Sequence, residues 1–122
     1  MEPVIVDSSV WTRHLREPFI PMVNLLRERK VLAHPLVTAE LMLGRVKDRT
    51  GLMEALRVLP PAPMVEHETV LELIEWEYLH GHGIGYVDAH LLASARARPG
   101  VMLWTDNPAL CRLAEHFGVA AE

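Results

Sequence analysis

Three of the four aspartates in this 122-residue chain stand where a predicted strand ends or a predicted helix begins. Asp7 directly follows Val4-Ile5-Val6, a β-branched run typical of a short strand that is buried on both faces. Asp88 and Asp106 each lie at the start of an apolar helical segment. Open α/β sheets place their ligands in the crevice outside the carboxyl ends of the strands. We therefore predict that these three carboxylates converge at one edge of a sheet.

Glu40 is a fourth candidate, because it lies in an apolar stretch where a carboxylate is costly unless it has a partner. Each acid also has a structural explanation. Asp7 can end a strand and cap the next helix, although Ser8 and Ser9 can cap it without Asp7. Glu40 and Asp88 can stabilise a helix N-terminus by roughly 0.3 to 1 kcal/mol.

Taken together, the structural explanations place several acids near one edge of a sheet with no lysine or arginine nearby in sequence to neutralise them. A divalent cation resolves that conflict. Carboxylate ligands without a cluster of histidines or cysteines favour Mg²⁺ or Mn²⁺ over zinc. The segment His80-Gly81-His82-Gly83 is interpreted as a turn, because its two histidines lack the further ligands of a zinc site.

The composition predicts one soluble intracellular domain over residues 1–122. Half of the residues are apolar, and the single cysteine, Cys111, excludes an internal disulfide. The chain has no apolar run of the roughly 18 residues that a membrane span needs. The formal net charge of -4 argues against strong nonspecific binding to nucleic acid.

Hydrophobic periodicity and turn residues predict an α/β domain with a parallel sheet covered by helices on both faces. The predicted strands lie at 4–6, 31–33, around 64–65 and at 101–104, with an edge strand at 119–120. The predicted helices lie at 8–15, at 19–30, from Thr38 with Glu40 in the first turn, and at 49–59, 67–79, 86–98 and 108–117.

Four segments of the sequence resemble the PIN-domain ribonucleases, and among them the VapC-type toxins of type II toxin-antitoxin pairs. The segments are VIVDSSVW at 4–11, TAEL at 38–41, GIGYVDAHLLASA at 83–95, and LWT at 103–105 with the acid that follows it. The third segment is the most specific, because it joins a glycine-rich turn, an acid and a helix of small residues in the family's order. The resemblance implies a three-layer α/β/α PIN-like domain with a short, mostly parallel central sheet.

The resemblance further implies a cytoplasmic, Mg²⁺-dependent endoribonuclease, with Mn²⁺ as a possible substitute, that is inhibited by a VapB-type antitoxin and forms a homodimer. Carried over to this chain, the catalytic and metal-binding acids are Asp7, Glu40, Asp88 and Asp106. Similar proteins usually carry Thr, any residue, then Asp, whereas here Asp106 follows Thr105 directly and Asn107 occupies the next position. Whether Asp106 or Asn107 takes the fourth position is left open.

Two alternatives remain at this stage. A phosphotransfer domain of the receiver or haloacid-dehalogenase type also uses Asp at strand ends, but it needs a lysine late in the chain, and the only lysines are Lys30 and Lys47. A catalytically inactive PIN-like scaffold would act through protein contacts alone. Metal-dependent cleavage of RNA separates the scaffold from the enzyme.

Overall fold

A computed structural model describes residues 2–121 of the chain. Its centre is a parallel sheet in the order β2-β1-β3, with β1 at Val4–Val6, β2 at Val31–Leu32 and β3 at Met102–Trp104. All three residues of β1 are buried, as their β-branched and apolar side chains predict. β1 is therefore the central strand, and the residue that follows it lies between the carboxyl ends of β2 and β3.

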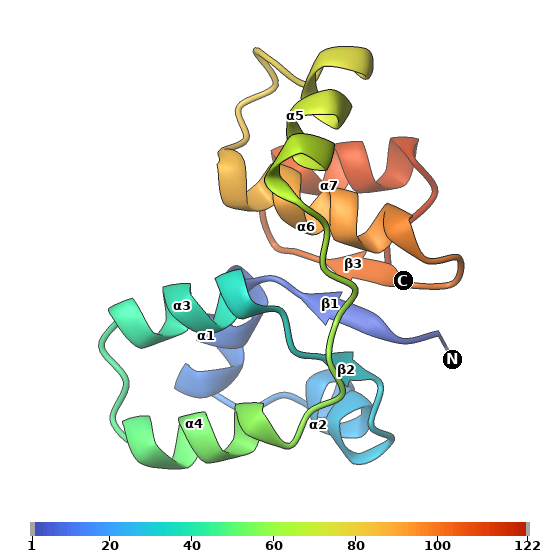
Figure 1. Cartoon of the computed structure of the whole chain (residues 1–122). Helices are drawn as coiled ribbons and strands as arrows, with labels where there is room; N and C mark the ends of the chain where they lie inside the picture. The colour runs from blue at the N-terminus through green and yellow to red at the C-terminus, as the bar shows by residue number, and fades with distance from the viewer. Residues whose placement is uncertain (1, 122) are drawn as a thin grey trace.

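Helices cover both faces of the sheet, which gives three layers (Figure 1). The helices α1, α2, α3 and α4 lie on one side, and α5, α6 and α7 lie on the other. Their bounds are Ser8–Arg16, Ile20–Arg27, Pro35–Leu43, Arg49–Arg57, His67–Trp76, Tyr86–Ala97 and Pro108–His116. The arrangement confirms the predicted α/β/α fold class with a short parallel sheet.

The helix α6 is buried on two sides, and small residues let a neighbouring helix approach on one of them. Ala89 and Ala93 pack with Val70 of α5, whereas Leu91, Leu92 and Ala95 belong to the main core, and α6 contacts β3. The turn before α6 contains Gly83 with a φ of 79°, a backbone conformation that residues with a Cβ rarely adopt. This turn fixes where α6 begins and therefore where Asp88, in its first turn, is placed.

Two predicted strands do not form as such in the structure. No strand forms at 64–65. Instead, Ala33 and Pro61 form an isolated parallel bridge in which Ala33 donates to the carbonyl of Pro60. The cause is the run of prolines after α4, since a proline has no N–H to extend a ladder. The edge strand at 119–120 is reduced to a bridge between Leu103 and Ala120.

The helices α2 and α3 also have other bounds than the sequence predicts. α2 ends at Arg27 rather than Lys30, because Arg29 adopts a φ of 56° that breaks the helix. α3 begins at Pro35 rather than Thr38, with His34 as its N-cap. Glu40 therefore lies in the second turn of α3 and not in the first.

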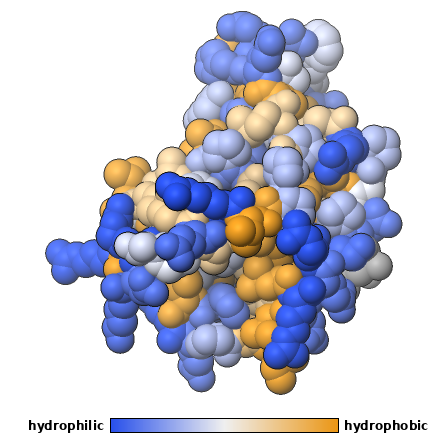
Figure 2. Space-filling model, turned by 60° about the horizontal axis from the view of Figure 1, so that its bottom comes forward, coloured by the Kyte–Doolittle hydropathy of each residue, from blue (hydrophilic) through white to orange (hydrophobic). Residues whose placement is uncertain are grey.

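Apolar side chains also reach the surface, and Figure 2 shows a face where they lie between hydrophilic ones. A groove of about 1190 Å³ lies between α2 and α7, with Val4, Met102 and Trp104 among its lining residues. None of the four candidate acids lines this groove. Among residues 2–121, no helix is long and apolar enough to cross a membrane.

Candidate active site

The register of the sheet brings Asp7 and Thr105 together. Val6 pairs with Trp104 in the parallel ladder, so the next residue of each strand leaves the sheet at the same edge. The backbone N–H of Asp7 donates to the carbonyl of Trp104 at 2.9 Å, which extends the pairing by one step. Two residues that are 98 positions apart in sequence thus become neighbours.

The Asp7 carboxylate is buried and accepts three hydrogen bonds. Its Oδ1 accepts from the backbone N–H of Ser8 at 2.8 Å. Its Oδ2 accepts from the hydroxyl of Ser9 at 2.8 Å and from the hydroxyl of Thr105 at 2.7 Å. Only 5% of Asp7 is exposed. Asp7 is also the N-cap of α1, so the capping and the functional interpretations apply to the same side chain.

Asp88 approaches the same edge from α6. Its Oδ2 accepts from the backbone N–H of Gly85 at 3.2 Å. Partial burial raises the pKa of Asp88 above its usual value, the Gly85 hydrogen bond lowers it, and the charge of Asp7 raises it. The side chains of Asp7 and Asp88 are therefore close enough to repel each other. Neither has a lysine or arginine partner among residues 2–121.

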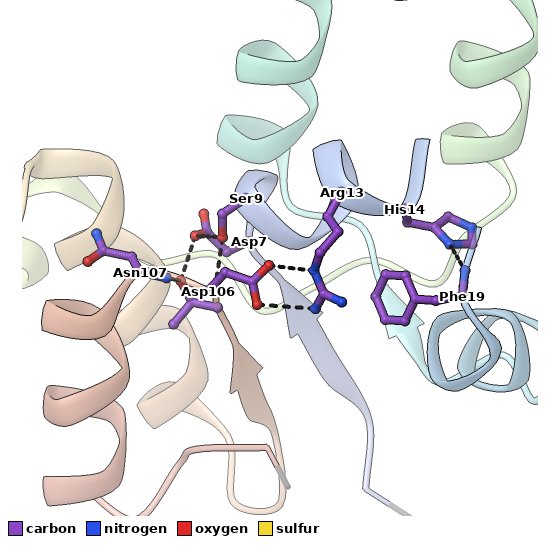
Figure 3. A network of polar contacts seen from close by, with 8 residues as sticks. Asp7, Ser9, Arg13, His14, Phe19, Asp106 and Asn107 are labelled. Atoms are coloured by element: carbon purple, nitrogen blue, oxygen red, sulfur yellow. Dashed lines mark hydrogen bonds and ion pairs between the residues drawn. The ribbon is translucent and has the colours of Figure 1, made fainter. Parts of the chain in front are cut away.

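Asp106 is held differently, by an arginine. Arg13 Nε donates to Asp106 Oδ2 at 2.8 Å, and Arg13 Nη2 donates to Asp106 Oδ1 at 3.2 Å. Figure 3 shows the Asp106 carboxylate directed toward Arg13. A basic residue that is distant in sequence therefore neutralises Asp106, although none lies nearby in sequence. The sequence missed this pair because 93 residues separate its members.

Asn107 is the N-cap of α7, and its side chain is engaged in that role. Its side-chain oxygen accepts from the backbone N–H of Ala109 at 3.0 Å, and Pro108 occupies the first helical position. In Figure 3 its side chain points away from the Arg13 and Asp106 pair. The Asn107 backbone N–H donates to the hydroxyl of Thr105 at 3.0 Å. Its backbone thus supports the hydroxyl that holds Asp7.

Glu40 is exposed on α3, and its side chain has no hydrogen bond or ion pair with any other described residue. The apolar neighbours of Glu40 in sequence therefore do not bury its carboxylate, and the predicted cost of an unpartnered charge does not arise there. Within the described part of the chain, no three side chains of His, Cys, Asp or Glu come together as a group that would hold a metal ion. The structure brings Asp7 and Asp88 to one edge, with Asp106 beside them, and the Glu40 side chain makes no described contact with any of the three.

A buried pair of histidines joins the helices that carry Glu40 and Asp88. His34 Nδ1 accepts from the backbone N–H of Leu36 at 3.2 Å, so in the neutral ring Nε2 carries the proton. His34 Nε2 then donates to the Ser94 hydroxyl at 2.9 Å, and Ser94 lies 3.5 Å from His90 Nδ1. Burial, and secondarily the charge of His90, lowers the pKa of His34 to about 4.

Sequence reasoning did not single out this pair. Its only local sign is His34 directly before Pro35, which is the position of an N-cap ahead of a proline-started helix.

The donor set at the edge fits a hard divalent cation. The two carboxylates carry like charge without a basic partner, and the surrounding groups are hydroxyl and carboxylate oxygens. Mg²⁺ is commonly held by one or two carboxylates and several waters, so the chain's own ligands need not complete its shell. Asp7 and Asp88 are the residues that could hold such an ion.

A parallel three-layer fold with acids after its central strand is the architecture of a family of domains, and the sequence matches that family's model. The model of the PIN domain matches residues 4–116, and the chain belongs to this family. The chain is also 40% identical over 117 residues to Ribonuclease VapC32 from Mycobacterium tuberculosis, in the strains CDC 1551 / Oshkosh and ATCC 25618 / H37Rv. Each alignment covers 96% of this chain and 94% of the relative. Membership of the family sets aside the phosphotransfer alternative.

Proposed function

We propose that the chain is a metal-dependent endoribonuclease of the VapC toxin type, with Mg²⁺ as its cofactor and Mn²⁺ as a substitute. The observation that carries the proposal is the convergence of Asp7 and Asp88 at the carboxyl edge of β1 without a basic partner. The similarity to ribonucleases over nearly the whole chain supports it. Asp7 and Asp88 hold the ion, Glu40 joins as a further ligand, and Asp106 lies at the rim.

The residues around Asp7 act by fixing one carboxylate rather than by touching the RNA. Two hydroxyls donate to Oδ2, which fixes the orientation of the carboxylate. Mg²⁺ held by Asp7 and Asp88 would activate a water and would offset negative charge on the scissile phosphate. Ser9 and Thr105 thus act as positioning residues, because outer partners of ligating carboxylates set their orientation.

The test is cleavage of RNA by the purified chain with Mg²⁺ and with EDTA, followed by mapping of new RNA 5′ ends in cells that express it without an antitoxin. We expect cleavage that requires Mg²⁺ and is lost in Asp88→Asn. Asp48→Asn is the matched control, because Asp48 caps the exposed start of α4 and lies outside the site. A pure protein that leaves RNA intact with both Mg²⁺ and Mn²⁺ would favour the inactive scaffold.

The role of Glu40 is tested by metal binding rather than by activity. A cation that binds the folded state raises the melting temperature, and at a fixed concentration the rise increases with the logarithm of its affinity. We expect the Mg²⁺-dependent shift to vanish in Asp88→Asn and to need more Mg²⁺ in Glu40→Gln. Because Glu40 is exposed and without a described partner, the melting temperature of Glu40→Gln without metal should equal that of the unmodified chain. An unchanged Mg²⁺ titration would remove Glu40 from the site.

We also propose a VapB-type antitoxin that inserts an arginine at the acidic edge, a homodimeric state and a cytoplasmic location. The physical support for the first is that a guanidinium fork matches a pair of carboxylates and can take the place of a cation. An antitoxin peptide should bind Asp88→Asn more weakly than the unmodified chain at the same salt concentration. Equal binding would show that the antitoxin inhibits by covering another part of the surface rather than by an arginine at the acidic edge. Light scattering of the free chain tests the dimer.

A further inference from the structure

We propose that the Arg13 guanidinium is a binding site for a backbone phosphate of the RNA, and that Asp106 is the residue that positions it. The inference rests on the proposed ribonuclease activity. It assigns Asp106 to the arginine rather than to the metal, and so revises the role that the family resemblance implies for this acid.

The guanidinium is held on two sides. Asp106 binds it through two parallel contacts of 2.8 and 3.2 Å, from Nε and Nη2. Its central carbon lies 4.0 Å from the centre of the Phe19 ring, a cation-π arrangement. Phe19 is itself fixed, because its ring packs edge-on against Trp104 and against His14. A long and flexible side chain is thereby confined to one position before RNA arrives, which lowers the entropy cost of binding.

Arg13 keeps free donors while it is held. A guanidinium has five N–H groups, and the Asp106 pair uses one on Nε and one on Nη2. The remaining three N–H groups, on Nη1 and Nη2, have no hydrogen-bond partner among residues 2–121. About half of the side chain, 49%, is exposed. The free side of the fork has the planar donor geometry that phosphate oxygens accept.

The position of Arg13 is linked to that of Asp7. Ser9 and Arg13 are four residues apart on α1 and therefore lie on the same side of that helix. The Ser9 hydroxyl donates to Asp7 and accepts from the backbone N–H of Asp106 at 3.0 Å. One residue thus joins the buried carboxylate to the backbone of the acid that holds Arg13, as Figure 3 shows. A phosphate on Arg13 would lie next to the edge where Asp7 is.

The competing assignment, with Asp106 as a metal ligand, requires this arrangement to be broken. The Asp106 carboxylate would have to leave both Arg13 contacts and turn toward Asp7. Arg13 would then lose its acidic partner while keeping Phe19. The two assignments predict different results for the same variants, because one affects RNA binding and the other affects metal binding.

The first experiment measures binding of a labelled single-stranded RNA of mixed sequence in Mg²⁺ at several NaCl concentrations, in the Asp88→Asn background to prevent cleavage. Loss of one phosphate contact should reduce the slope of log K against log salt by about 0.7. We expect this reduction and a weaker affinity in Arg13→Ala, and an unchanged slope with weaker affinity in Arg13→Lys. The control is Arg27→Ala, which removes the same charge from the end of α2, ahead of the opposite edge of the sheet.

The second experiment tests whether Asp106 acts through Arg13. Asp106→Asn is compared in the presence of Arg13 and in the Arg13→Ala background, and the two effects on RNA affinity are subtracted. We expect Asp106→Asn to weaken RNA binding when Arg13 is present and not when it is absent. In the otherwise unmodified chain, Asp106→Asn should leave the Mg²⁺ titration of the melting temperature unchanged.

Three results would overturn the inference. The first is an RNA salt slope in Arg13→Ala that matches that of Arg27→Ala. The second is the same effect of Asp106→Asn in both backgrounds. The third is a tenfold or greater increase in the Mg²⁺ needed by Asp106→Asn, which would make Asp106 a metal ligand. Failure of the proposed function is seen separately, as absence of RNA cleavage by the unmodified chain.

Discussion

The carboxyl ends of β1 and β2 lie at the same edge of the sheet, but the acid after β1 is buried and the acid after β2 is exposed. After β1 the acid follows at once, and Asp7 is buried with three hydrogen bonds. After β2 the buried polar residue is His34, which is 1% exposed and caps α3. The acid of that segment, Glu40, comes in the second turn of α3 and is exposed.

The difference shows how an acid is made rigid. Asp7 is fixed because β3 delivers Thr105 beside it and α1 delivers Ser9, so two hydroxyls converge on one oxygen. Glu40 has a longer side chain and no such partners in the described residues. We infer that the β1 end is preorganised, whereas the β2 end is organised around a histidine and leaves its acid free to turn toward a cation.

The contrast between the ends of β1 and β2 would fail most clearly if Asp7 and Asp88 were not the catalytic acids. We expect Asp7→Asn and Asp88→Asn each to lower cleavage by at least about a thousandfold, beyond the 10-fold to 100-fold typical of losing an outer partner. Their stabilities without metal should differ in sign. Asp88→Asn removes a charge that Asp7 repels, and should melt at the same or a higher temperature.

Asp7→Asn should lower the free energy of unfolding by roughly 1 to 3 kcal/mol, and with it the melting temperature. The Ser9 and Thr105 hydroxyls each donate to Asp7 and already accept from a backbone amide, so an amide nitrogen in place of Oδ2 leaves their hydrogens without an acceptor. Thermal melts in EDTA measure both variants, with Asp48→Asn as the control. Identical shifts in melting temperature for the two site variants would contradict the preorganised set of hydrogen bonds around Asp7.

The histidine at the β2 end sharpens the comparison through pH. The pKa of His34 is lowered to about 4 in the folded chain, whereas an unfolded histidine titrates near 6.5. The unfolded state therefore binds more protons between these values. Stability should fall as the pH drops from about 6.5 to about 4, by about 3 kcal/mol in total.

Chemical denaturation between pH 7.5 and 4.5 measures this loss. His34→Asn is the informative variant, because asparagine keeps an N-cap acceptor and removes the titrating ring. We expect its stability to vary less with pH than that of the unmodified chain. Asp88 contributes with the opposite sign, since its raised pKa makes the folded state gain stability on acidification. Carrying His34→Asn into Asp88→Asn separates the two contributions. An unchanged pH slope would mean that His34 titrates normally.

The sequence predicts much more at the β1 end than at the β2 end, for a physical reason. A β-branched strand followed by an acid and two serines is a local pattern, and it places Asp7 correctly. Asp88 is likewise placed by the glycine-rich turn and small residues around it. The Arg13 and Asp106 pair depends on two residues 93 positions apart, and the His34 and Ser94 pair on residues 60 apart. Local propensity contains no information about such contacts.

The predicted third strand failed for the same kind of reason. Met64 and Val65 are apolar, but pairing needs free N–H groups in register, and the preceding prolines leave only the bridge at Pro61. The start of α3 was missed because histidine is not among the usual N-cap residues.

The two hydroxyls at the β1 end should have a smaller effect than the carboxylates. Thr105→Val keeps the shape of the side chain and removes the donor to Asp7, and we expect a 10-fold to 100-fold loss of Mg²⁺ affinity or cleavage. Ser9→Ala should affect cleavage similarly and also disturb Asp106, whose backbone N–H it holds. Mg²⁺ titrations of cleavage compare them, with Thr12→Val on the exposed face of α1 as the control. Full activity in Thr105→Val would mean that Asp7 needs no such support.

The smallest effect concerns Asn107, which follows Asp106 and is the other candidate for the fourth position of the family's acidic set. Its side chain caps α7, so Asn107→Ala should cost roughly 1 kcal/mol of stability through loss of that hydrogen bond. Its backbone N–H, which supports Thr105, remains in the variant, so cleavage should be largely retained at a temperature well below the melting point. Asn107→Asp should keep the cap, because aspartate serves as well at this position. Thermal melts and cleavage rates of both variants in one buffer decide the matter. A gain of Mg²⁺ affinity in Asn107→Asp would show that the position faces the metal, against the orientation in Figure 3. Unchanged affinity would leave Asn107 as a structural cap beside an edge built by Asp7 and Asp88.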